Sequence, residues 1–192
     1  MIAGAVSAKP GNYMVFFPSY GFMEHVHKIF SAKYPRVKSF VQRKNMSYAE
    51  REEFLGNFKD DEGKLRIGFC VLGGAFSEGI DLPGRRLIGT VIVGVGLPGI
   101  SDENNIMRDY YEEKCGMGYD YAYTYPGMNS VLQAVGRVIR TENDKGIAIL
   151  IDDRYAEPKY KKLFPPEWKN IKIAGDAQSL AEIARRFWEK RE

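Results

Sequence analysis

Residues 87–95 read Leu-Ile-Gly-Thr-Val-Ile-Val-Gly-Val, a nearly continuous apolar run. Runs of this kind, rich in Ile and Val, are typical of a strand that is covered on both faces, as in a parallel sheet between layers of helices. The run therefore predicts an α/β fold for this chain.

Similar runs recur on both sides of residues 87–95, with helical patterns between them. Apolar residues repeat at helical spacing after Ser19, a helix-capping residue. The segment from Ser47 to Glu50 predicts a capping box that opens a second helix. This alternation predicts a mostly parallel β-sheet flanked by helices. The other expected strands cover 13–17, 37–41, 66–72 and 146–152.

A small helical insert is expected near residues 101–126. Ser101, followed by Asp102 and Glu103, predicts a helix N-terminus with an acidic first turn, and the helix should run to about Cys115. The tyrosines of the insert leave two interpretations open, a base-stacking surface or a packed helical pair, and aromatic residues at helical spacing usually serve a core. These tyrosines are Tyr110, Tyr111, Tyr119, Tyr121, Tyr123 and Tyr125.

The length and apolar content of the chain predict one globular domain over residues 1–192. With 192 residues and 44% hydrophobic content, the chain has enough apolar material to bury a core. Residues 1–11 are small-residue rich, lack the blocks of a signal peptide, and are expected to be a flexible start. Residues 156–192 are expected to form a C-terminal helical extension. No apolar run reaches bilayer length, so no membrane partner is expected.

The net charge and the cysteine count limit which partners and metal sites the sequence supports. Lys and Arg total 28 against 25 Asp and Glu, and this formal charge of +3 is too small to indicate a nucleic-acid partner by itself. Cys70 and Cys115 are spaced far outside zinc or disulfide patterns, which suits a reducing, cytoplasmic setting. Two thiolates are also too few for an iron–sulfur cluster, which usually needs four.

The segment from Gln133 to Arg140 reads Gln-Ala-Val-Gly-Arg-Val-Ile-Arg, within a region that predicts one or two helices around Pro126. On an ideal helix, Gln133, Arg137 and Arg140 fall within an arc of about 60°. Paired guanidinium groups are suited to spreading charge on transferring phosphoryl oxygens, and Gly136 leaves room for a close approach. A solvated basic helix face would show the same pattern.

A second polar segment, Ser77-Glu78-Gly79-Ile80-Asp81, follows the expected strand 66–72. Its glycine permits a tight turn, and its polar groups lie in a strand-to-helix loop, where α/β sheets bind ligands. An ordinary turn in which Asp81 and Ser77 satisfy local backbone donors is the alternative.

Three segments, taken in order, resemble the motifs of one family. Val15 to Tyr20 matches motif IV, Ser77 to Asp81 is similar to motif V, and Gln133 to Arg140 resembles motif VI of the DinG and XPD branch of superfamily-two helicases. The resemblance covers Asn12 to about Tyr155. It implies a RecA-like fold and the C-terminal motor domain, helicase domain 2, of a DinG/XPD-like DNA helicase.

The resemblance also implies roles for individual residues. Arg137 and Arg140 would act as arginine fingers on the γ-phosphate of ATP, and Gln133 would orient them. Ser19 and Tyr20 suit a phosphate contact and base stacking, although an N-cap serine and a core-edge tyrosine are an equal alternative. The residues expected at the nucleotide are Glu78, Gly79, Asp81 and Gly136. The residues expected at single-stranded DNA are Phe17, Ser19, Tyr20 and Ser77.

The same resemblance implies partners that this chain lacks. ATP and Mg²⁺ would be held mainly by a first motor domain, which would also hold any iron–sulfur cluster, and the parent would translocate 5′ to 3′ in DNA repair.

Two rival functions remain open: a noncatalytic nucleotide-binding or scaffolding module derived from a helicase half, and a metal-dependent phosphoesterase that uses Asp81, Asp152 and Asp153. For Asp153, pairing with Arg154 or with a loop backbone is the favoured role.

The sequence lacks the two motifs that hold nucleotide and magnesium in a complete motor. A Walker A loop requires Gly-x-x-x-x-Gly-Lys followed by Ser or Thr, but Gly63-Lys64 is followed by Leu65. No acidic magnesium motif has the matching context. We expect this chain alone to release no phosphate from ATP, with or without single-stranded DNA. A phosphate-release assay tests this, and a rate that rises with added oligonucleotide would contradict it.

Overall fold

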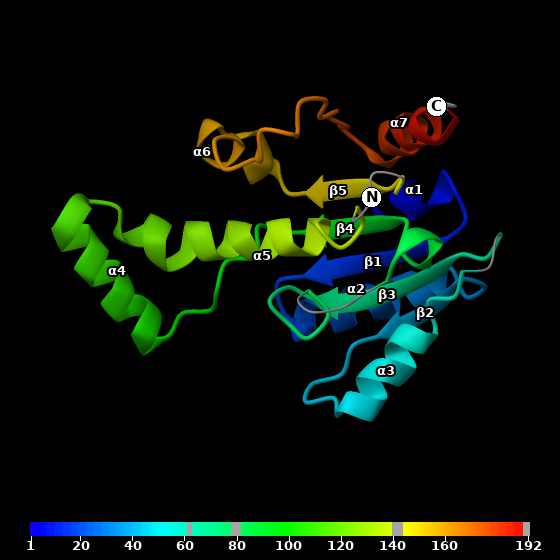
Figure 1. The fold of residues 1–192 in the computed structure, drawn as a ribbon, viewed down its shortest axis with the longest axis horizontal. Coiled ribbons are helices and arrows are strands. Elements are labelled where there is room, and N and C mark those ends of the chain that lie inside the picture. Colours follow the sequence, from blue (N-terminus) through cyan, green and yellow to red (C-terminus); the bar gives the residue numbers. More distant parts are fainter. Residues whose placement is uncertain (61–62, 78–81, 140–143, 190–192) are drawn as a thin grey trace.

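A single parallel sheet organises the computed structural model, which describes residues 1–60, 63–77, 82–139 and 144–189. The described strands lie in the order β2-β3-β1-β4-β5, and every neighbouring pair is parallel (Figure 1). The predicted α/β fold is confirmed. The strands are β1 (Asn12–Phe17), β2 (Lys38–Val41), β3 (Arg66–Val71), β4 (Gly89–Val93) and β5 (Ile147–Ile151).

The central strand β1 is buried along its whole length and contributes to both faces of the sheet. Val15 lies between Phe69 of β3 and Val91 of β4 in the hydrogen-bonded register. Because side chains alternate along a strand, Met14 and Phe16 enter the apolar cluster under α3 (Tyr48–Gly56) and α5 (Tyr125–Val135). The neighbouring side chains of β1 enter a second cluster under α2 (Tyr20–Lys33).

The helix boundaries follow the capping residues of the sequence. Ser19 accepts a hydrogen bond from the Phe22 backbone, and Ser47 with Glu50 forms the predicted capping box. Within the described residues, no helix has both the length and the apolar composition needed to cross a bilayer. The remaining α-helices are α1 (Ile2–Ser7), α4 (Asp102–Cys115), α6 (Pro158–Lys161) and α7 (Ala177–Glu189).

The two ends of the chain pack on each other. Residues 1–11 were expected to be a flexible start, but they contain α1, which buries Ala5 and Val6. A side chain at Gly4 would lie 2.4 Å from the carbonyl oxygen of Ala177 in α7, so the two helices approach closely. The expectation failed because α1 packs on α7, which lies at the far end of the described chain.

The insert forms the packed helical pair that its tyrosines favoured. Helix α4 begins at its cap Ser101 and ends at Gly116, whose φ of 67° is left-handed. Tyr111 of α4 stacks on Tyr121 of the π-helical turn Asp120–Thr124, with ring centroids 4.0 Å apart. The pair projects away from the sheet (Figure 1).

Two contacts tie the insert region to the rest of the fold. Lys159 of α6 forms an ion pair with Asp120. Gly96 and Gly127 let α5 pack backbone to backbone on the loop after β4, because a side chain at Gly127 would lie 2.8 Å from the Val95 carbonyl oxygen.

Candidate functional site

The loops that follow β1, β2 and β3 meet at one edge of the sheet. The carboxyl ends of parallel strands share an edge, and ligands of α/β proteins bind there. β3 lies between β1 and β2, so these three loops are direct neighbours. Each of them carries polar residues that the structure joins by hydrogen bonds.

Gln42, the first residue after β2, links the neighbouring loops. Its amide nitrogen donates to the Tyr20 hydroxyl at 3.0 Å, and its amide oxygen accepts from the Val71 backbone at 2.9 Å. Gln42 is 3% exposed; its bond with the Val71 backbone is buried, and its bond with Tyr20 is partly buried. Gly74 leaves room for this amide, because a side chain there would lie 2.9 Å from the Gln42 nitrogen.

Gln42 was not among the residues predicted from the sequence. The available signal was its position, since it is an uncharged polar residue directly after a strand, at the edge where ligand sites form. Hydrophobic patterning could not distinguish it from the adjacent Arg43 and Lys44, which continue the loop.

The loop after β3 turns tightly and reaches the segment after α5. Ser77 donates from its backbone and from its hydroxyl to the Gly74 carbonyl, at 3.0 and 2.8 Å. The Ser77 carbonyl in turn accepts from Nε of Arg137 at 3.3 Å. Two segments 60 residues apart are therefore held side by side.

The predicted arginine-bearing helix ends earlier than expected. Helix α5 stops at Val135, and Gly136 is its C-cap. The backbone N–H groups of Arg137 and Val138 bond to carbonyls three residues back, which tightens the turn beyond α-helical geometry. The 60° arc of an ideal helix therefore does not apply to Gln133 and Arg137, and that prediction is wrong. Gln133 and Gly136 are exposed, and Arg137 is half-buried.

The structure separates the four residues expected at DNA into two groups. Ser19 is exposed and caps α2, and Tyr20 is half-buried with the Lys44 ammonium 5.4 Å from its ring. Phe17 has no exposed surface and stacks on Phe69 in the core. Ser77 is also fully buried, with its hydroxyl bonded to Gly74.

The side chains of Phe17 and Ser77 are thus unavailable to a strand of DNA in this structure, and their predicted contacts are corrected. Phe17 is the last residue of the central strand and serves the core. Ser77 shapes the loop and presents its carbonyl to Arg137. Glu78, Gly79, Asp81 and Arg140 lie outside the described residues.

One of the acidic residues that follow β5, Asp152, forms an ion pair with Arg154. Arg154 donates twice to Asp152 at 2.8 Å and, through these bonds, holds the pKa of that carboxyl below its usual range. Asp153 was expected to pair with Arg154 or with a loop backbone, and the first of these is corrected, because the partner of Arg154 is Asp152. Among the residues that the structure describes, no three His, Cys, Asp or Glu side chains are grouped as metal ligands.

The buried amide of Gln42 predicts a stability loss that an exposed amide would not show. Gln42→Leu keeps a similar volume but leaves the Val71 N–H and the Tyr20 hydroxyl without this partner. We expect the free energy of unfolding to fall by about 1–3 kcal/mol in urea titrations. Gln133→Leu, at an exposed position, is the matched control and should change stability by less than about 0.5 kcal/mol. Equal losses in the two variants would contradict the role of Gln42.

Comparison with known proteins places this chain in a family. The family model described as the helicase C-terminal domain matches residues 2–171. The fission yeast (Schizosaccharomyces pombe) ATP-dependent DNA helicase chl1 is 29% identical over 86% of this chain. The Dictyostelium discoideum transcription and repair factor IIH helicase subunit XPD is 29% identical over 83%. The chain spans only 22% and 21% of the lengths of these two relatives.

Solved structures give the same assignment. A structure of an XPD helicase superposes with a TM-score of 0.62 and 27% identity, over 81% of this chain and 27% of that one. The C-terminal domain of the DEAD-box protein Dbp5 superposes with a TM-score of 0.52 at 13% identity, over 93% of this chain and 83% of that domain, and supports the RecA-like fold alone. The chain belongs to the helicase C-terminal domain family and is similar to the corresponding domain of DNA helicases of the XPD and CHL1 type.

Proposed function

We propose that this chain is the second motor domain of an ATP-dependent DNA helicase and that it supplies Arg137 and Arg140 to ATP bound mainly on a first motor domain. The observation that carries the proposal is the bond from Arg137 to the Ser77 carbonyl. It joins the two segments that resemble motifs V and VI. A helicase motor needs both segments at the same interdomain cleft.

The chemistry of arginine suits this role. The guanidinium group stays ionised and offers a planar fork of donors to phosphoryl oxygens. Nε of Arg137 donates to the Ser77 carbonyl, which places the guanidinium group beside the loop that resembles motif V. Since the sequence has no Walker A loop and no acidic magnesium motif, the phosphates and Mg²⁺ would be held by the other domain.

The DNA side of the proposal uses Ser19, Tyr20 and Lys44. An exposed hydroxyl, an aromatic ring and an ammonium group at one sheet edge suit a single strand with its phosphates and bases. Tyr20 is joined through Gln42 to the backbone of β3, six residues before Ser77. Closure of the ATP cleft would therefore move the DNA-contacting loop with the loop that holds Arg137. Translocation from 5′ to 3′ and a role in DNA repair belong to the same proposal.

The cysteines of this chain do not fit a resident iron–sulfur cluster. Cys70 is fully buried in β3, where burial raises the pKa of its thiol, and Cys115 is exposed at the end of α4. They belong to separate parts of the fold, and a cluster usually needs four thiolates. Any cluster of the complete helicase would belong to another domain.

The nucleotide role of Arg137 is tested in a protein that contains both motor domains. Arg137→Ala should lower DNA-stimulated ATP turnover by about 10³-fold or more, because an arginine finger acts on the transition state. Arg137→Lys should lose ATP turnover as well, since lysine keeps the charge but lacks the planar fork of donors. Single-stranded DNA affinity should change little. Arg185→Ala, at an exposed arginine of α7, is the control and should retain full activity.

A loss of DNA affinity without a loss of turnover in Arg137→Ala would contradict the assignment. No ATP turnover in the unmodified two-domain protein would instead favour a noncatalytic module.

The DNA role of Tyr20 is tested by anisotropy with labelled oligothymidine on the same two-domain protein. Tyr20→Ala should weaken binding about tenfold, because stacking on one base is worth about 1–3 kcal/mol. Tyr20→Phe keeps the ring, so its affinity should stay close to that of the unmodified protein. Tyr48→Ala, at a tyrosine that is 79% exposed on α3, is the matched control. If both alanine variants lose the same affinity, Tyr20 has no specific contact.

A further inference from the structure

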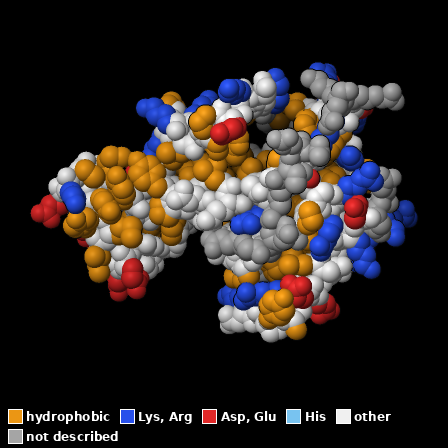
Figure 2. Space-filling model, in the orientation of Figure 1, with side chains coloured by type: hydrophobic (Ala, Val, Ile, Leu, Met, Phe, Trp, Pro, Cys, Tyr) orange, Lys and Arg blue, Asp and Glu red, His pale blue; other side chains and the backbone are white. Residues whose placement is uncertain are grey.

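Helix α4 lies outside the site described above and buries none of its residues. Several large apolar side chains in and next to the insert face solvent, among them Ile106 at 70% exposure and Ile100, just before the insert, at 88%. Figure 2 shows apolar side chains over much of the insert, with acidic groups at its margins. Exposed apolar patches of this kind on soluble domains usually mark interaction surfaces.

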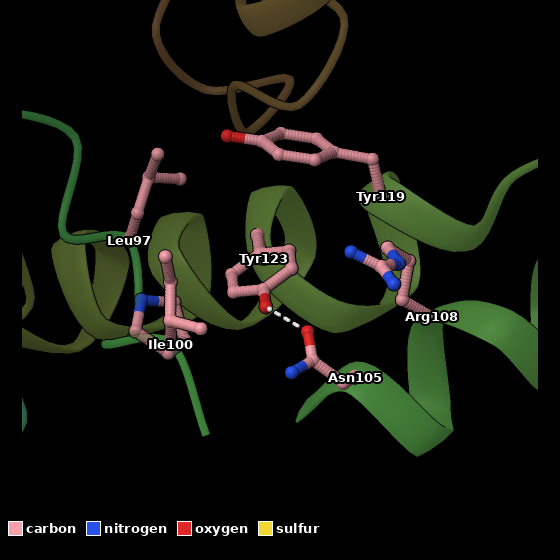
Figure 3. Close-up of a pocket in the computed structure, with 7 residues that line it drawn as sticks. Leu97, Ile100, Asn105, Arg108, Tyr119 and Tyr123 are labelled. Carbon is pink, nitrogen blue, oxygen red and sulfur yellow. Dashed lines mark hydrogen bonds between the residues drawn. The ribbon is translucent and has the colours of Figure 1, made fainter. Parts of the chain in front are cut away.

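A pocket of about 300 Å³ lies between the loop after β4 and the helical pair of the insert. Leu97 and Ile100 lie on one side of it and Tyr119 on the other, with Tyr123 between them (Figure 3). The volume is sufficient for one large apolar or aromatic side chain. The walls are mainly apolar, which is typical of pockets that receive an anchor residue.

Hydrogen bonds within the protein hold the polar side chains that line the pocket. The Tyr123 hydroxyl donates to the Asn105 amide oxygen at 3.4 Å (Figure 3). Asn105 therefore offers its amide nitrogen to a carbonyl acceptor. Arg108 donates twice to Asp109, at 2.9 and 2.8 Å, so the cation that lines the pocket is neutralised by its neighbour.

The charge of α4 decides the class of ligand. The helix carries five carboxylates and two cations, a formal charge of −3, whereas the whole chain is +3. Nucleic acid binds surfaces with an excess of positive charge, so an acidic helix with a paired arginine disfavours it. An apolar surface with an acidic rim is complementary to a protein segment that carries an apolar anchor between basic residues.

We propose that this pocket and the acidic helix α4 form a docking site for an amphipathic, basic segment of a partner protein. A large apolar side chain of the segment would enter the pocket beside Ile100 and Tyr119. Lys or Arg residues on either side would face the carboxylates of α4, among them Glu113. This interaction does not depend on ATP or DNA, so it stands apart from the proposed motor function.

The probe is a fluorescein-labelled 14-residue peptide of Leu and Lys with one central Trp, measured by anisotropy on the full chain. The same peptide with Glu in place of Lys and a labelled oligothymidine are the comparison probes. We expect saturable binding of the basic peptide, at least tenfold tighter than the acidic peptide, and no competition by oligothymidine. Equal binding of the two peptides would overturn the proposal.

Two surface substitutions locate the site. Ile100→Lys places a cation at the pocket rim and should weaken the basic peptide at least tenfold. Ile173→Lys makes the same change at a residue that is 76% exposed outside the insert, and it should leave the affinity unchanged. Glu113→Lys should weaken binding severalfold, whereas Glu52→Lys on α3 should not. Neither isoleucine is buried, so loss of folding does not confuse the result.

Three outcomes would exclude this partner class. The first is equal loss in Ile100→Lys and Ile173→Lys, which would mean nonspecific binding. The second is oligothymidine binding that Ile100→Lys strengthens and Tyr119→Ala removes, which would identify a base-stacking site. The third is concentration-dependent self-association, seen by light scattering and abolished by Ile100→Lys, which would mean that a second copy covers the pocket.

Discussion

The central strand β1 sets the constraint from which the rest of the structure follows. It is hydrogen-bonded to β3 on one side and β4 on the other, and both of its faces are buried. A strand that is apolar on both faces requires cover on each of them, and the neighbours of β1 are both parallel to it. Parallel neighbours place successive loops at the same edge. The candidate site is a consequence of that geometry, because its residues come from loops that the sheet brings together.

The polar groups at this edge form two linked sets. In the first set, Gln42 joins Tyr20 to the backbone of β3. In the second, Ser77, in the loop after β3, accepts a hydrogen bond from Arg137. A buried amide that bonds to two partners holds both in one geometry, because leaving either partner unpaired costs free energy. In the proposed motor, such a scaffold would keep the nucleotide-facing and DNA-facing groups at fixed positions relative to one another.

The insert differs in its contacts and its charge from the edge of the sheet that carries the candidate site. It is joined to the core through α5 and through the ion pair between Lys159 and Asp120. Its own contacts are mainly aromatic, and its outer helix is acidic and uncovered within the described structure. An acidic surface attracts basic partners and repels nucleic acid, so the insert suits a partner of a different class from the one proposed at the strand ends.

The sequence by itself determined the strands, the parallel α/β class and the helix caps, because hydrophobic period and capping chemistry depend on residues a few positions apart. Ser47 with Glu50 and Ser101 are examples that the structure confirms. The three motif segments could also be recognised from the sequence, since the residues of each motif lie close together in the chain.

Only the tertiary structure decided which of those residues are available and what holds them. Phe17 belongs to the segment that resembles motif IV, but its burial depends on Phe69, which lies on another strand. The bonds of Gln42 and Arg137 span 29 and 60 residues, and the docking of α1 on α7 spans nearly the whole chain. Such pairings are fixed by packing, which no local pattern encodes, so they emerged only once the sheet had placed the loops side by side.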